Sequence, residues 1–184
     1  MTEKTLIHSR NITTKTYELR RNELLVEGVL EDVRLFPSQL YGARKTIDAG
    51  TVHRIVVRLS ISLPETLITA AEAEMETVPS EICRQVRGIV TKLIGIRINR
   101  GFTKIVKEMI GGRKGCLHMT NLILAMASAA IQGQWAYYAR MRDESLAQLP
   151  EADLTVVADS CWLWRTDGDY YNHIVRRMEK QEEV

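Results

Sequence analysis

An alternation of apolar and polar residues that runs through most of residues 52 to 62 constrains the fold more than any other feature of the chain. Arg54, Arg58, Ser60 and Ser62 occupy one half of the alternation, interrupted by Val56, and His53 falls in the apolar half. The apolar positions are Ile55, Val57, Leu59 and Ile61. A period of two residues is typical of a β-strand that presents one face to the core and one to solvent. The pattern therefore predicts a sheet covered on a single face.

Three further segments show a weaker alternation of the same kind, at residues 12–20, 23–34 and 66–76. Arg21-Asn22 separates the first two segments and predicts a hairpin turn. In the segment 23–34, every second residue from Leu24 to Leu30 is apolar or glycine, and Asp32 continues that face. Residues 1–76 are therefore predicted to be mainly strands.

From residue 77 to 141 the apolar spacing becomes helical. A first helix is expected from Pro79-Ser80 to Gly95, and a second from Asn99 to Gly111-Gly112. The predicted core stripe of the first comprises Ile82, Val86, Ile89, Val90 and Leu93. A third helix, from about Cys116 to Met141, is apolar nearly all round, which favours contact with the sheet and with a second copy or another protein.

Strands followed by helices predict an α+β fold, a small antiparallel sheet packed by helices from the C-terminal part. The 184 residues suit a single domain, 1–184, in which residues 150–184 form a C-terminal extension with a turn at 166–168 and a short terminal helix.

The net charge of +2 gives no global bias toward nucleic acid, and no apolar run is long enough to span a bilayer. The start of the chain lacks the apolar segment of a signal peptide. Three widely spaced cysteines fit a reducing compartment better than a disulfide framework. We therefore expect a cytoplasmic protein with no nucleic-acid or membrane partner.

Histidines and cysteines occupy positions that suit a metal or thiol site. His53 lies on the apolar face of the most regular strand, and Cys83 and Cys116 lie near predicted helix N-termini. Unpaired backbone N–H groups and the helix dipole favour an anionic ligand or nucleophile there. Both cysteines could equally be small buried hydrophobes. The predicted metal ligands are His53, Cys83, Cys116, His118 and Cys161.

Whether His118 and Cys161 can join the metal site depends on local structure. In a continuous helix His118 points about 200° away from Cys116, so both reach one ion only if the helix begins at or after Leu117. Cys161 is either a fourth ligand or a core thiol beside tryptophans. Asp32 and Glu72 or Glu74 are acid or base candidates whose default is surface solvation.

The run Gly111-Gly112-Arg113-Lys114-Gly115-Cys116-Leu117-His118, taken with His53, Pro79 to Cys83 and Gly101-Phe102, resembles an uncharacterised bacterial domain-of-unknown-function family. The resemblance covers most of the chain, including Asp159-Ser160-Cys161, and implies no established activity.

Residues 52–138 also resemble, more weakly, the iron–sulfur scaffold proteins of the NifU and IscU type. That resemblance implies a small antiparallel sheet followed by helices, with three ligands converging on one exposed metal site. His53, Cys83 and Cys116 fall in the order of the three scaffold cysteines. The aspartate two residues after the first cysteine is replaced here by Ile55, and the histidine before the third by Gly115.

The sequence thus favours a metal-binding accessory or scaffold protein that holds zinc, iron or an iron–sulfur cluster. One alternative is a thiol enzyme with Cys116 as nucleophile, His53 or His118 as base, and the glycine-rich turn as an oxyanion site. A second alternative is a metal-free module that forms homo-oligomers through the long apolar helix.

Overall fold

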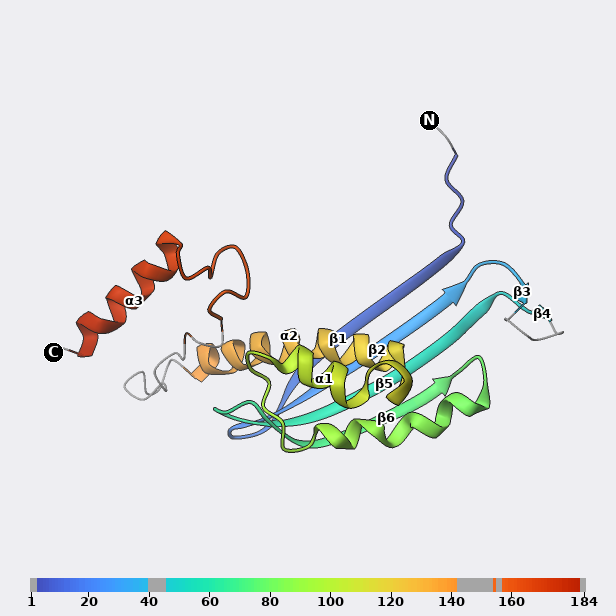
Figure 1. The fold of residues 1–184 in the computed structure, drawn as a ribbon, viewed down its shortest axis with the longest axis horizontal. Helices are drawn as coiled ribbons and strands as arrows, with labels where there is room; N and C mark the ends of the chain where they lie inside the picture. The colour runs from blue at the N-terminus through green and yellow to red at the C-terminus, as the bar shows by residue number, and fades with distance from the viewer. Residues whose placement is uncertain (1–2, 40–45, 142–153, 155–156, 183–184) are drawn as a thin grey trace. The chain divides into compact units, whose positions relative to one another are not determined.

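The computed structural model describes residues 3–39, 46–141, 154 and 157–182 (Figure 1). The chain divides into two compact units, Met1–Arg142 and Asp143–Val184. The first unit contains the sheet and all helices but the last. The expectation that both units form a single domain stays a prediction.

The first unit is built on a four-stranded antiparallel sheet with the order β1-β2-β5-β6 (Figure 1). Its strands are β1 (His8–Arg20), β2 (Glu23–Arg34), β5 (Gly50–Ser62) and β6 (Leu67–Thr77). Two short strands, β3 (Ser38–Gln39) and β4 (Thr46–Ile47), pair with each other. The predicted hairpin turn is confirmed, and Asn22 adopts the left-handed conformation there with φ of 59°.

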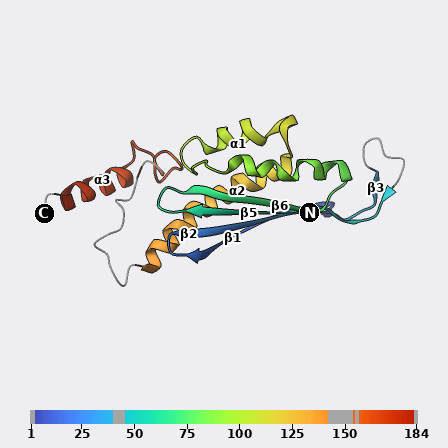
Figure 2. The same cartoon turned by 90° about the horizontal axis from the view of Figure 1, so that it is seen from below.

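Helices follow the sheet in sequence and lie on one face of it (Figures 1 and 2). They are the 3₁₀ helices η1 (Glu81–Leu93) and η2 (Gly112–Lys114) and the α-helices α1 (Phe102–Ile110) and α2 (Leu117–Arg140). The N-terminal sheet and the C-terminal helices confirm the predicted α+β fold.

The predicted core stripe of the first helix is partly wrong. Val90 and Leu93 are buried, but Ile82 is 70% exposed. The cause is the 3₁₀ geometry, in which residues three apart lie in one line. That line brings Cys83, rather than Ile82, toward the core, where it is half-buried.

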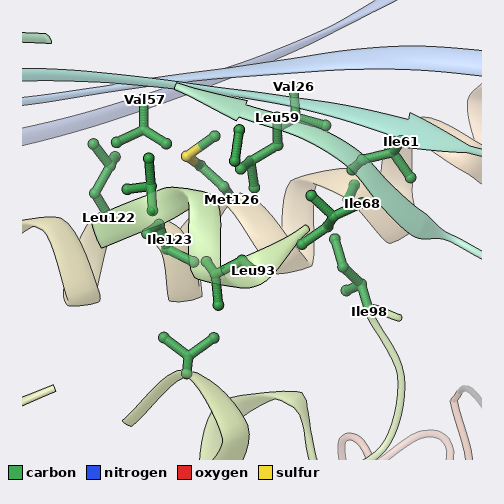
Figure 3. Close-up of a cluster of buried hydrophobic side chains, with 14 of the residues drawn as sticks. Val26, Val57, Leu59, Ile61, Ile68, Leu93, Ile98, Leu122, Ile123 and Met126 are labelled. Carbon is green, nitrogen blue, oxygen red and sulfur yellow. The ribbon is translucent and has the colours of Figure 1, made fainter. Parts of the chain in front are cut away.

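The core lies between the inner face of the sheet and the helices. Aliphatic side chains from β2, β5 and β6 meet those of η1 and α2 there (Figure 3). Gly28 permits a close approach of α2, because a Cβ atom at this position would lie 2.6 Å from Sδ of Met126. Close packing in the middle of β2 therefore fixes the position of α2 over the sheet.

The opposite face of the sheet carries ion pairs in place of a hydrophobic layer. Arg58 contacts Glu27 at 2.8 Å, and it also contacts Glu74. Arg54 contacts Glu76 at 2.6 Å. The predicted alternation on β5 is therefore confirmed, and Glu74 belongs to the charged outer face of the sheet.

In the second unit, the described residues include a turn region and the helix α3 (Asp169–Glu182). Asp159 Oδ1 accepts hydrogen bonds from the backbone N–H and the hydroxyl of Thr166, at 3.0 and 3.1 Å. The rings of Trp164 and Tyr170 meet edge to face at 5.2 Å between centroids. The predicted turn and terminal helix are confirmed.

Candidate functional site

A row of polar side chains crosses three neighbouring strands at one end of the sheet. Arg10 on β1 is the register partner of Asp32 on β2, and Asp32 is the register partner of His53 on β5. Asp32 continues the core-facing positions of β2, as the period of two predicted. The N-terminus of α2 adds His118, whose Nε2 lies 3.4 Å from Oδ2 of Asp32.

Asp32 is the buried centre of this group, with only 3% of its surface exposed. Arg10 donates two hydrogen bonds to it, from Nε to Oδ1 at 2.6 Å and from Nη2 to Oδ2 at 2.8 Å. His8 Nε2 lies 3.4 Å from Oδ1. The expectation that surface water solvates Asp32 is therefore wrong, because a bidentate guanidinium partner replaces that water.

The two imidazoles stack against each other, with ring centroids 3.8 Å apart. His53 Nδ1 lies 3.1 Å from Oδ2 of Asp32. That nitrogen is buried, and its angle to the carboxylate does not make a hydrogen bond, so it has no such partner among the described residues. Buried polar atoms are nearly always satisfied, so this nitrogen, which lies beside the carboxylate without good hydrogen-bond geometry, is a candidate ligand atom.

The pKa values of the group follow from burial and charge. Burial would raise the pKa of Asp32, but the hydrogen bonds and charge of Arg10 and the nearby imidazoles outweigh it and lower the pKa. Burial lowers the pKa of His53 despite the opposing effect of Asp32. Burial, reinforced by His53, lowers the pKa of His118 to about 4. Both imidazoles are therefore neutral at pH 7, which is the form that binds a metal.

Cys116 is the N-cap residue of α2, and the helix begins at Leu117. This is the arrangement required for Cys116 and His118 to approach one another, and Sγ lies 3.8 Å from Nδ1 of His118. The thiol therefore contacts the imidazole nitrogen that faces away from Asp32.

Steric constraints require glycine at two positions before Cys116. Gly112 has φ of 57°, in the left-handed region that favours glycine. A Cβ atom at Gly115 would lie 2.3 Å from the backbone oxygen of Ile110. The motif thus permits the tight connection from α1 that places Cys116 and His118 beside the sheet.

Two further predicted ligands are Cys83, in the first unit, and Cys161, in the second. Cys83 is half-buried in η1 and packs against the hydrophobic core, and no atom of it belongs to the group around Asp32. Cys161 is exposed in the second unit. The structure thus brings together His53, His118 and Cys116 from the predicted set, and their role as ligands stays a prediction.

Sequence reasoning gave no role to Arg10 or His8. One signal for Asp32 was present, because an acidic residue that continues the apolar face of a strand must find a partner in the core. The partner itself lies on another strand, so its identity depends on strand pairing.

The fold and the group define a class, an α+β domain with a carboxylate and two imidazoles at the edge of its core. The chain belongs to a family described as a protein of unknown function, DUF2889, whose pattern matches residues 8–132. That range contains all six residues of the site, namely His8, Arg10, Asp32, His53, Cys116 and His118.

No curated protein and no solved structure matches the chain. The resemblance to NifU and IscU scaffolds therefore stays a prediction. Within the described residues, no helix combines the length and the apolar character needed to cross a membrane.

Proposed function

We propose that this protein binds one divalent transition-metal ion, zinc or iron, through Asp32, His53 and His118. The observation that carries the proposal is the proximity of one ligand atom from each residue, all within 4.8 Å of one another. Two imidazoles and one carboxylate are a donor set that suits zinc and non-haem iron.

The distances support a shared ion. Ligand atoms about 2.1 Å from a tetrahedral ion lie about 3.4 Å from each other. The two distances to Oδ2 of Asp32, 3.1 Å from His53 Nδ1 and 3.4 Å from His118 Nε2, are close to this spacing. The carboxylate is thus placed to share an ion with each imidazole, and the stacked rings would turn so that both nitrogens point at it.

The types of ligand atom indicate which kind of metal centre the site suits. Iron–sulfur clusters are held mainly by cysteine thiolates, whereas this group offers an oxygen and two nitrogens. A mononuclear ion therefore fits better than a cluster. Three protein ligands leave a coordination position open for a further ligand. The role that we propose for the protein, as the sequence favours, is that of an accessory or carrier.

The test is the metal content of the full chain, purified without an affinity metal column and then offered zinc or ferrous iron. We expect about one ion per chain. Asp32→Asn, His53→Gln and His118→Gln should each abolish binding. His173→Gln, at an exposed histidine of α3, is the matched control and should leave it intact. Failure to take up either ion, or full retention in Asp32→Asn, would contradict the proposal.

Cys83→Ser separates this ligand set from the one that includes Cys83. Retained metal in Cys83→Ser supports the group around Asp32. If the variant loses the metal but is still folded by circular dichroism, Cys83 would be a metal ligand after all.

One observation favours a second function, a thiol enzyme. Cys116 Sγ contacts Nδ1 of His118, whose Nε2 faces Asp32, in the order nucleophile, base and orienting carboxylate. Iodoacetamide labelling of the metal-free protein tests it, with Cys83 and Cys161 as internal references. Selectively fast labelling of Cys116 that slows in His118→Gln supports the enzyme, and equal rates at Cys116 and at exposed Cys161 argue against it.

A further inference from the structure

We propose that the metal site binds a small oxyanion, a carboxylate or phosphate group, at its open coordination position. This inference rests on the proposed function and names the class of ligand that the same site takes. It follows from the charges that surround the ion.

The protein supplies no net negative charge to the ion. The negative charge of Asp32 is matched by Arg10, which forms hydrogen bonds to both carboxylate oxygens. Imidazoles bind metals in the neutral form, so His53 and His118 add no charge. A divalent ion would therefore leave about two uncompensated positive charges at a site whose central carboxylate is buried, which is unfavourable without an anionic partner.

Among the described residues, no other group supplies that charge in this arrangement. The residues described in contact with Asp32 are Arg10, His8, His53 and His118, none of them acidic. Cys116 contacts the nitrogen of His118 opposite the one that faces Asp32, so its sulfur does not lie on the side where the ion binds. An anion from solution is then the partner that would balance the ion.

The positive groups around the site favour an oxyanion, and the exposed β1 side of the site gives it access from solvent. The side chains of His8 and Arg10 are 45% and 36% exposed, so the β1 side of the group is open to water. Arg10 bonds Asp32 through Nε and Nη2, so Nη1 is the donor that it could offer to a carboxylate or phosphate oxygen. The first turn of α2 contains no acidic residue, and its dipole adds positive potential beside His118.

The test uses cobalt(II) as the probe ion in the full chain, in a buffer whose anions coordinate weakly. Acetate and inorganic phosphate are titrated separately. We expect the visible cobalt spectrum to change with saturation at one anion per ion, and the apparent Kd for cobalt to tighten by about tenfold, within the usual range for coupled ligands. His173→Gln, the exposed control on α3, should respond as the parent protein does.

Three results would overturn the inference. Cobalt could bind with an affinity and a spectrum that neither anion changes. The spectrum could change with pH alone and remain insensitive to both anions, which would assign the charge to hydroxide from bound water. A near-ultraviolet sulfur-to-cobalt band that disappears in Cys116→Ser would assign it to the thiolate. No cobalt binding at all would instead refute the proposed function, and the inference with it.

Discussion

Arg10 and Asp32 face each other across the β1–β2 pair and are joined by two hydrogen bonds of 2.6 and 2.8 Å. The ion pair gives a buried carboxylate the compensation that it needs in the core, and it also orients the oxygen that faces both imidazoles. Breaking one half of such a pair costs more than removing both, because the remaining charge loses its partner.

We therefore predict strong coupling between these two residues in the metal-free protein. Asp32→Asn should lower the free energy of unfolding by about 2 kcal/mol, and the coupling energy with Arg10→Gln should be about 1–3 kcal/mol. Urea unfolding of the two single variants and the double variant measures it. The exposed pair Arg54 and Glu76 is the control and should couple by less than about 1 kcal/mol. Equal coupling in both pairs would contradict a special role for Asp32.

Acid should destabilise the metal-free protein in the pH range set by the histidines. The pKa of His118 is about 4 in the folded protein and 6.5 in the unfolded chain, so the unfolded chain binds more protons between those values. The free energy of unfolding should then fall as the pH is lowered from about 6.5 to 4, by at most about 3 kcal/mol from this residue. The lowered pKa of His53 acts in the same direction.

Urea unfolding at a series of pH values, with a chelator present, checks this prediction. His118→Gln should flatten the fall, whereas His173→Gln should not change it. Asp32 has a lowered pKa, so its contribution is present above its ordinary value of 3.8 and is lost at lower pH. A stability curve that is level between pH 6.5 and 4 would contradict the burial of neutral imidazoles.

The approach of α2 to the sheet should be sensitive to one methyl group. Gly28→Ala would place Cβ 2.6 Å from Met126 Sδ and 2.9 Å from Leu122 Cδ1, so we expect a loss of about 1–3 kcal/mol in the free energy of unfolding. Gly88 in η1 is the matched control, because nothing lies within 4 Å of a Cβ atom there. Gly88→Ala should change stability by less than about 1 kcal/mol. Similar losses in both variants would argue against close packing at Gly28.

Cys116 should support the metal without binding it directly. Its sulfur contacts the second nitrogen of His118, the position from which partners orient ligand imidazoles. Cys116→Ala should weaken zinc affinity by about tenfold, as such outer partners commonly do. Competition with a chromophoric chelator measures the change, and Cys161→Ala, at an exposed thiol, is the control. Unchanged affinity in Cys116→Ala would leave the thiol without a role in metal binding.

The sequence predicted the strands and the α+β fold well, because alternation reports directly which face of a strand is buried. It also predicted that Asp32 and His53 lie on core-facing positions. It did not predict that Arg10 lies opposite Asp32, since the register between strands depends on how the whole sheet pairs. Cys83 was a ligand candidate because it lies near a predicted helix N-terminus. In the 3₁₀ helix η1 it packs half-buried against the hydrophobic core, and its role as a ligand stays a prediction.

Two of the three proposed ligands, Asp32 and His53, are register partners on adjacent strands, and the third comes from the first turn of the helix that crosses them. The register shift after Asp32 leaves Val52 without a partner between Thr51 and His53. Because a slip of one residue moves a side chain to the opposite face of a sheet, an insertion or deletion between residues 53 and 57 would separate the ligands without removing any of them. Within this family, the length of that segment should therefore separate chains that keep this arrangement of Asp32 and His53 from chains that lose it.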